Sequence, residues 1–254
     1  MLERLSLRGR LRRAVRVADV ARTAMPGRVQ RLPGPYFVKH GYRTREAPMY
    51  TEEHRADGYV WQPDVYRDGA SAAVRLGCRR IVDVGCGNGE KLASLHPAFE
   101  VVGIDYRANL VRCRELYGFG TWLEHDLESE DPLPVPPELL EDAVVVCADV
   151  IEHLTHPERL LTKLAGCLPT VGCILVSTPE RDLWWGVHHM GPPPNPAHVR
   201  EWATGEFVAL LAHAGFEHGI VRLTRSNDRL PHENTLLALL FPNDVLLQQV
   251  ETVP

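Results

Sequence analysis

Two apolar runs, each ending in residues that suit a ligand, place the strongest constraint on how this chain can fold. The first, Val82-Asp83-Val84, leads into Gly85-Cys86-Gly87-Asn88-Gly89, and the second, residues 101–104, ends at Asp105. Glycines in such a loop let the backbone turn tightly and approach a ligand that a Cβ would keep away. A carboxylate at the end of the next strand, about 20 residues after Gly85, is placed to accept hydrogen bonds from ribose hydroxyls. Together the two runs predict an α/β fold that holds an adenosine-containing cofactor.

The order of the predicted elements favours one architecture. Apolar runs alternate with helix-like segments from residue 64 to residue 177, which predicts a parallel sheet with helices on both faces. The run 143–147 is entirely apolar, as expected for a strand buried on both faces. The predicted helices span residues 64–76, 89–96, 107–116, 157–168 and 204–214, and the predicted strands span residues 80–84, 99–104, 120–124, 143–148, 172–177, 216–225 and 234–241.

Length and composition narrow the class of protein. The chain has 254 residues, 44% of them hydrophobic, which is enough for one full α/β domain with an appendage. Its net charge of −5 argues against nucleic-acid binding over the whole surface. We expect no membrane span, because no apolar run approaches about 20 residues. The six cysteines form no Cys-x-x-Cys pair, which favours a reducing, cytoplasmic compartment. An oligomeric state is not indicated.

The first part of the chain differs from the rest. Residues 1–31 contain nine arginines against two acidic residues, which predicts a basic N-terminal helix. Around Trp61 and Gln62 we expect either an aromatic lid over the cofactor or ordinary packing. We therefore predict an N-terminal extension over residues 1–63 and a cofactor-binding domain over residues 64–254.

The glycine loop does not match the dinucleotide fingerprint, which needs a glycine where this chain has Glu90. A pyrophosphate binds bare amides at a helix N-terminus, and the carboxylate of Asp83 beside the loop would repel it. An acidic residue at this place suits an ammonium group instead. S-adenosylmethionine carries an ammonium, a carboxylate and a sulfonium, and it has no phosphate. The loop therefore favours this methyl donor over a dinucleotide.

With these residues the chain resembles the class I S-adenosylmethionine-dependent methyltransferases, from about Arg80 to the C-terminus. His125-Asp126-Leu127 resembles their segment at the adenine ring, and Cys147-Ala148-Asp149 resembles their segment beside the methionine moiety. The resemblance implies a Rossmann-like, seven-stranded, mostly parallel sheet of order 3-2-1-4-5-7-6, with the seventh strand antiparallel. It also implies that the residues that contact S-adenosylmethionine are Asp83, Gly85, Cys86, Gly87, Asp105, Tyr106, Asp126, Leu127 and Asp149.

A second set of polar residues follows the strand 143–148. Asp149-Val150-Ile151-Glu152-His153 opens the next segment, and His198 lies in a later loop. This combination resembles the ubiquinone-biosynthesis-type O-methyltransferases and the small-RNA 2′-O-methyltransferases. For the RNA enzymes the resemblance implies that the side chains at Asp149, Glu152, His153 and His198 bind a divalent metal ion that contacts the substrate hydroxyls. Asp149 stands where those enzymes have glutamate, so its reach is shorter.

Three interpretations of this motif stay open. The four residues hold a metal ion such as Mn²⁺ or Zn²⁺. Alternatively, His153 and His198 are catalytic and one of them takes a proton from the acceptor. In the third interpretation, the Glu-His pair caps a helix and orients a loop without taking part in chemistry.

The segment 179–203, which we call the acceptor loop, is rich in proline. It contains two adjacent tryptophans, Trp184 and Trp185, followed by His188 and His189. These side chains either line a pocket for an aromatic or sugar-like acceptor or pack the long loop onto the domain.

The predicted function is methyl transfer from S-adenosylmethionine to an oxygen of a small molecule, such as a secondary metabolite, a quinone or a sugar-like compound. One alternative is a metal-dependent RNA 2′-O-methyltransferase, for which the arginine-rich N-terminus would supply phosphate contacts. A second is N- or C-methylation of a small molecule. A third is a non-catalytic binding protein, against which the intact glycine loop and Asp105 argue.

Overall fold

The frame of the molecule is one eight-stranded sheet in the computed structural model, which describes residues 15–17, 34–49 and 60–252. The strands are β1 (Val15–Arg16), β2 (Arg80–Val84), β3 (Glu100–Asp105), β4 (Thr121–Glu124), β5 (Ala143–Ala148), β6 (Cys173–Pro179), β7 (His218–Arg225) and β8 (Glu233–Phe241). Their order in the sheet is β1-β7-β8-β6-β5-β2-β3-β4. Strands β2 to β6 are mutually parallel, whereas β8 is antiparallel to both β6 and β7.

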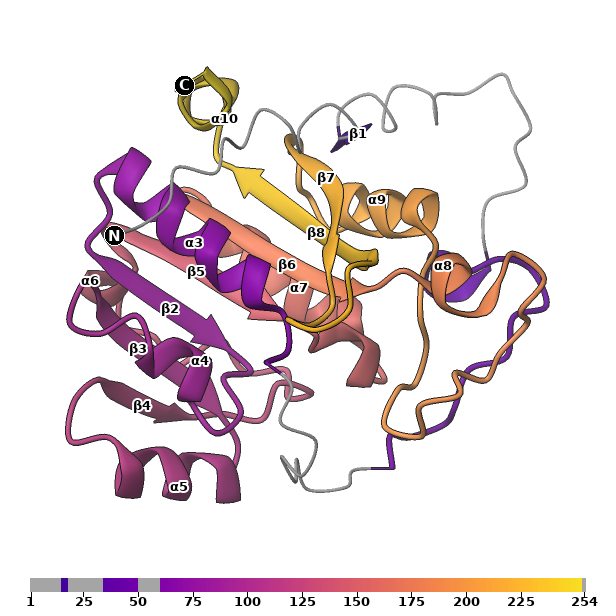
Figure 1. The fold of residues 1–254 in the computed structure, drawn as a ribbon, viewed down its shortest axis with the longest axis horizontal. Helices are drawn as coiled ribbons and strands as arrows, with labels where there is room; N and C mark the ends of the chain where they lie inside the picture. Colours follow the sequence, from indigo (N-terminus) through magenta and orange to yellow (C-terminus); the bar gives the residue numbers. More distant parts are fainter. Residues whose placement is uncertain (1–14, 18–33, 50–59, 253–254) are drawn as a thin grey trace.

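Helices cover both faces of this sheet (Figure 1). The helices are α3 (Pro63–Leu76), α4 (Glu90–Ala93), α5 (Ala108–Leu116), α6 (Pro137–Leu140), α7 (Pro157–Cys167), α8 (Arg181–Trp185), α9 (Thr204–His213) and α10 (Asp244–Thr252), with short 3-10 helices at Pro35–Phe37 and Ile151–His153. One core cluster joins α3, α4, α5 and α10 to the sheet through side chains such as Tyr66 and Leu110. The other joins α7 and α9 to the sheet through Leu160 and Phe207. Among the described helices, none is both long and apolar enough to cross a bilayer.

The sheet confirms the predicted fold class. The seven predicted strands are β2 to β8, and they lie in the predicted order 3-2-1-4-5-7-6 with the seventh strand antiparallel. Strand β5 is buried along its whole length, as its apolar sequence predicts. Because β2, β3 and β5 are parallel, the segments that follow them meet where the carboxyl ends of the strands lie side by side. We call this row of strand ends the carboxyl edge of the sheet.

Some local features differ from the expectation. Val15–Arg16 lies inside the predicted basic helix but forms an eighth strand, β1, which pairs antiparallel with β7 through Val15 opposite Val221. The edge of a sheet offers unpaired N–H and C=O groups, which an extended segment can satisfy and a helix cannot. Apart from Val17, which is buried, the rest of the predicted helix lies outside the described residues. The sequence also does not predict α8, because five residues in a proline-rich loop are too short to establish a helical period.

Residues 34–49 lie along the acceptor loop (Figure 1). The Arg43 N–H donates a hydrogen bond of 2.8 Å to the Met190 carbonyl, and the Arg45 N–H donates one of 2.9 Å to the Val199 carbonyl. The acceptor loop is therefore held along its length by a segment from the other end of the chain. The division into an extension over residues 1–63 and a domain over the rest stays a prediction.

A buried ion pair joins α3 to β7. The side chains of Asp68 and Arg222 are 6% and 1% exposed, and their charged groups are in contact. Removal of one partner would leave the other charge in the interior without compensation.

We expect Asp68→Ala to lower the free energy of unfolding by about 3–5 kcal/mol, because the Arg222 guanidinium stays buried without its carboxylate. Urea denaturation at pH 7 would measure the loss. The matched control is Asp244→Ala, which removes the exposed pair with His218 and should cost less than about 1 kcal/mol. Equal losses for the two variants would contradict the structural role given to the buried pair.

Candidate functional site

The glycine loop begins at the carboxyl end of β2 and has the backbone that its sequence predicts. Gly85, Gly87 and Gly89 have φ angles of 84°, 57° and 73°, in the left-handed region that other residues rarely adopt. A Cβ added to Gly85 would lie 2.4 Å from Cγ2 of Val150. The side chain of Cys86 is buried, and its thiol lies 3.8 Å from the Gly87 carbonyl oxygen. The loop thus presents mainly backbone groups, as a closely bound ligand requires.

Asp105, at the end of β3, is fixed against this loop. Its Oδ2 accepts a hydrogen bond of 2.7 Å from the Gly87 N–H. Its Oδ1 accepts one of 2.7 Å from the Tyr106 N–H and one of 2.9 Å from Asn109 Nδ2. Each carboxylate oxygen has two lone pairs, and because two donors share Oδ1, Oδ2 is the oxygen through which Asp105 would bind a ribose hydroxyl. The predicted ribose acid is already oriented beside the glycine loop.

Asp83 lies buried in β2, and Tyr66 of α3 donates a hydrogen bond of 2.8 Å to its Oδ2. Its Oδ1 has no hydrogen-bond partner among the described residues. Burial raises the pKa of Asp83 to about 7, while the Tyr66 hydroxyl and the Lys91 ammonium act in the opposite direction. A carboxyl group in this position gains from a cation placed beside it, which fits the role predicted for it toward an ammonium group.

The other residues predicted to contact the cofactor follow β3 and β4. Tyr106 is 41% exposed, and the guanidinium carbon of Arg107 lies 4.5 Å from its ring centre. Asp126 is exposed and accepts a hydrogen bond of 3.0 Å from the Glu128 N–H, while Leu127 packs partly against the core. These positions lie at the strand ends where they are expected, and their contact with the cofactor stays a prediction.

Glu152, His153 and His198 come together although they belong to two separate segments. One ligand atom from each lies within 4.8 Å of the others, and we call these residues the Glu-His-His cluster. The two imidazole rings meet edge to face with their centres 4.9 Å apart. Asp149, the fourth predicted ligand, is not part of the cluster. Its Oδ1 accepts a hydrogen bond of 3.0 Å from Ser177 Oγ, and its Oδ2 accepts one from Gln62 Nε2.

Each histidine of the cluster is oriented through its Nδ1. In His153 this atom donates a hydrogen bond of 2.8 Å to the Ala197 carbonyl, which places the lone pair on Nε2. In His198 it lies 2.5 Å from Glu201 Oε1, and Nε2 of the same ring accepts a hydrogen bond of 2.9 Å from Asn195 Nδ2, which a metal ion bound at this nitrogen would replace. Carbonyl and carboxylate partners of this kind fix the tautomer of metal-binding histidines. Burial, with a further contribution from His198, lowers the pKa of His153 to about 4, so this imidazole is neutral at pH 7.

Glu152 is the fully buried member of the cluster. Its Oε2 accepts a hydrogen bond of 3.0 Å from Thr178 Oγ1, whereas its Oε1 has no partner among the described side chains and backbone groups. Burial raises the pKa of Glu152 well above its ordinary value, and the charge of Asp149 acts in the same direction. An unsatisfied buried oxygen is costly unless a ligand compensates it. One carboxylate with two imidazoles is a common donor set for Zn²⁺ and related ions, so the cluster fits a divalent transition metal.

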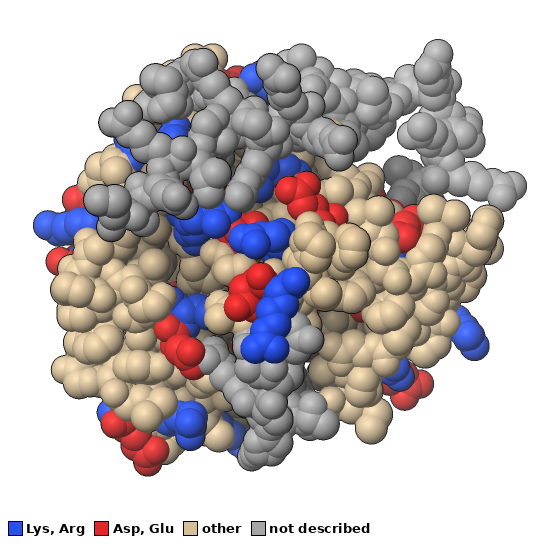
Figure 2. Space-filling model, in the orientation of Figure 1, with Lys and Arg blue, Asp and Glu red and all other residues tan. Residues whose placement is uncertain are grey.

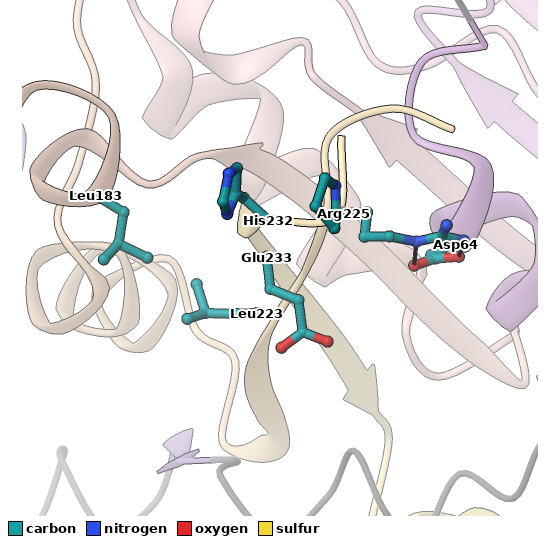
Figure 3. A pocket seen from close by; sticks show the side chains of 7 residues that line it. Asp64, Leu183, Leu223, Arg225, His232 and Glu233 are labelled. Atoms are coloured by element: carbon teal, nitrogen blue, oxygen red, sulfur yellow. Dashed lines mark hydrogen bonds and ion pairs between the residues drawn. The ribbon is translucent and has the colours of Figure 1, made fainter. Parts of the chain in front are cut away.

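A cavity of about 510 Å³ lies between the acceptor loop and the β7–β8 hairpin (Figure 3). On one side, the Arg225 guanidinium donates hydrogen bonds of 2.8 and 3.0 Å to the Asp64 carboxylate. Leu183 of α8 lies on the other side. Because β7 runs parallel to β6, the cavity is at the sheet edge that also carries the glycine loop. The lining residues are Asp64, Leu183, Leu223, Arg225, Pro231, His232 and Glu233.

The tryptophans of the acceptor loop take part in holding it. The indole N–H of Trp185 lies 2.5 Å from Glu201 Oε2, and the rings of Trp184 and Trp185 are 5.7 Å apart. Glu201 therefore links Trp185 to His198. The contact between Trp185 and Glu201 favours the packing interpretation for Trp185. His188, in the same loop, is exposed.

Several residues reach the site from elements that carry no motif. Tyr66 comes from α3 and donates to Asp83. Ser177 and Thr178 come from the end of β6 and donate to Asp149 and Glu152, respectively. Lys91, in α4, donates a hydrogen bond of 3.1 Å to Gln62 Oε1. A position at the carboxyl end of a parallel strand is a usable signal for Ser177 and Thr178. For Tyr66 and Lys91 the only signal is nearness in sequence to the glycine loop or to the lid.

Comparison with known proteins agrees with this geometry. Residues 29–220 match a family model described as a methyltransferase domain. A probable S-adenosylmethionine-dependent methyltransferase of Mycobacterium tuberculosis is 32% identical over 148 residues, which cover 57% of this chain and 51% of that protein. A ubiquinone biosynthesis O-methyltransferase of Xanthomonas oryzae is 31% identical over 157 residues, which cover 53% of this chain and 64% of that protein. The chain thus spans about half the length of the curated relatives it matches.

The fold has a counterpart among solved structures. The crystal structure of the S-adenosylmethionine-dependent methyltransferase SibL in its apo form superposes with a TM-score of 0.50 at 18% identity. The superposition covers 72% of this chain and 55% of that one. At this level of identity the similarity concerns the fold alone.

Asp83→Asn should change how stability depends on pH. With a pKa of about 7, the folded carboxyl keeps its proton where the unfolded carboxyl, with an ordinary pKa of 3.8, has lost it. The contribution of this group to stability therefore falls as the pH rises from about 4 to about 7, and asparagine removes that slope. When the pH is raised from 5 to 8, the free energy of unfolding of the variant should therefore increase by about 2–3 kcal/mol relative to that of the wild type.

Urea titrations at the two pH values would measure this gain. The control is Asp131→Asn, which changes an exposed aspartate and should follow the wild type at both pH values. The same pH slope for wild type and Asp83→Asn would show that the buried carboxyl is not protonated in the folded state.

Proposed function

Because the chain belongs to the family of methyltransferase domains, within the class I S-adenosylmethionine-dependent superfamily, we propose that it methylates a hydroxyl oxygen of a small-molecule acceptor. The glycine loop and the acids at the strand ends support the donor site. The Glu-His-His cluster is the observation that supports a hydroxyl group as the methyl acceptor. The O-methyltransferase from Xanthomonas oryzae, 31% identical over 157 residues, supports the same acceptor atom.

The methyl donor would lie across the carboxyl ends of β2, β3 and β5. Asp105 would accept hydrogen bonds from its ribose, and Asp83 would attract its ammonium group. Asp149, after β5, would border the methionine moiety. In this arrangement the sulfonium would lie near the segment that carries Glu152 and His153.

Methyl transfer is an in-line displacement, in which the acceptor oxygen attacks the methyl carbon and sulfur leaves as a neutral thioether. Alignment of the two reactants supplies much of the acceleration. A hydroxyl acceptor must also lose its proton. A general base works best when its pKa is near the working pH, so His153, with a pKa of about 4, is a weak base.

The same neutral imidazole is a good metal ligand, and we therefore favour the metal-binding interpretation of the cluster. Glu152, His153 and His198 would hold a divalent ion, which would lower the pKa of the acceptor hydroxyl so that the hydroxyl passes its proton to solvent water. The chain itself orients the ligands, through the Ala197 carbonyl on His153 and through Glu201 on His198.

The described part of one face of the molecule favours a small acceptor over RNA. On the face drawn in Figure 2, Lys and Arg side chains are mixed with Asp and Glu side chains among the described residues. RNA binding usually depends on a continuous basic area. Methylation of a ribose 2′-hydroxyl of RNA is the second candidate, because the same cluster would serve it.

Glu152→Gln should lower methyl transfer about 100-fold or more, because it removes a carboxylate from the cluster. Binding of S-adenosylhomocysteine should stay within about threefold of the wild type, since the donor site is intact. Transfer of tritiated methyl to a panel of catechols, hydroquinones and sugar-like polyols would measure the first effect, and calorimetry the second. Chelation should abolish the transfer, and Mn²⁺ or Zn²⁺ should restore it.

The matched control is Glu158→Gln, a partly exposed glutamate in the first turn of α7, which should leave both quantities unchanged. Full activity of Glu152→Gln, or activity that survives exhaustive chelation, would contradict the metal role. Transfer to a short RNA and to none of the small molecules would favour the second candidate.

A further inference from the structure

Lys91 brings a positive charge to the donor site. It lies in the first turn of α4, two residues after Gly89, so the rigid glycine loop fixes its backbone. Its Nζ donates a hydrogen bond of 3.1 Å to Gln62 Oε1 and lies 5.2 Å from the centre of the Tyr66 ring. The side chain is partly buried, which strengthens its interactions with nearby charges relative to an exposed lysine.

The Lys91 ammonium acts on both acids that border the proposed methionine site. Burial raises the pKa of Asp83 to about 7 and also raises the pKa of Asp149, and Lys91 opposes both increases. Two neutral residues connect the three charges. Gln62 accepts from Lys91 and donates to Asp149, and Tyr66 donates to Asp83 while its ring faces Lys91. The cation and the two acids therefore share one polar group of residues at the ends of β2 and β5.

The methionine end of the methyl donor has complementary charges. Its ammonium and its carboxylate are attached to the same carbon, so a site for it needs an anion and a cation close together. Asp83, whose Oδ1 has no hydrogen-bond partner among the described residues, would supply the anion, because a bound ammonium favours its ionised form. Lys91, whose ammonium lies over the ring of the same Tyr66 that donates to Asp83, is the cation.

We propose that Lys91 binds the α-carboxylate of the methyl donor and so selects a ligand with an intact amino-acid end. The inference rests on the proposed donor site. Lys91 reaches the carboxylate by rotation of its flexible four-carbon side chain away from Gln62. A charge-assisted hydrogen bond in a partly buried site contributes more to affinity than an exposed ion pair does.

A different role for Lys91 predicts the opposite result. If its ammonium only occupied the place of the donor's ammonium between Asp83 and Asp149, it would compete with the ligand. Removal of its charge would then strengthen donor binding. The two roles can therefore be separated by the direction of the change in affinity.

The experiment uses calorimetry with two ligands that differ only in the carboxylate. These are S-adenosylhomocysteine and its decarboxylated analogue, S-adenosyl-3-thiopropylamine. Lys91→Met, which keeps the apolar bulk of the side chain, should weaken S-adenosylhomocysteine about 10–100-fold. The same change should not weaken the decarboxylated analogue. The wild type should bind the analogue at least about tenfold more weakly than S-adenosylhomocysteine.

Two further variants make the result interpretable. Lys163→Met removes the charge of a lysine that donates to the Ser129 carbonyl, and it should leave both affinities unchanged. Lys91→Arg keeps the charge and should restore part of the preference for the carboxylate. Unchanged or tighter binding of S-adenosylhomocysteine by Lys91→Met, or an equal loss for both ligands, would overturn the proposal. Failure of the wild type to bind either ligand would overturn the donor site itself.

Discussion

The hydrogen bond from the Gly87 N–H to Asp105 is the contact on which the candidate site depends. It joins the loop after β2 to the end of β3, and it can form because these neighbouring strands are parallel and end at the same edge. Positive φ angles at the three glycines let the loop turn back over this edge. The segment after β5 reaches the same edge and brings the two acids Asp149 and Glu152 to it, and the end of β6 supplies Ser177 and Thr178, which donate hydrogen bonds to these acids. The sheet therefore determines which side chains can share a ligand.

Polar groups are concentrated at that edge, and the backbone is strained there. Gln62 and Asp149 both have left-handed backbone angles, with φ of 49° and 52°, and their side chains are hydrogen-bonded to each other. Such conformations cost about 1–3 kcal/mol each and persist where the surroundings enforce them, often at functional sites. On the acceptor side, residues 34–49 hold the loop that carries His198, and Glu201 links this histidine to Trp185. The fold thus loses some stability at this edge, and the strained conformations fix groups that face a ligand.

Much of the fold follows from local pattern, whereas the site follows only in part. Apolar runs and glycines predict the strand order and the loop, because burial and positive φ leave few alternatives for such residues. Strand β1 is missed because two residues inside an arginine-rich segment carry no strand pattern. Three of the four predicted metal ligands converge, whereas Asp149 is hydrogen-bonded to Ser177 and Gln62 instead. The sequence does not predict these two contacts, because both partners are distant from Asp149 along the chain. Lys91 is missed for the same reason, since its place beside two acids depends on contacts that no spacing rule encodes.

The central claim is that the glycine loop and Asp105 form the site of the methyl donor. Calorimetric titration of S-adenosylhomocysteine into the wild type and into Asp105→Ala tests it most directly. We predict one binding site per chain, with affinity at least about tenfold weaker in the variant, because the ribose loses a charge-assisted acceptor. No binding to the wild type, or equal affinity in the two proteins, would contradict the account.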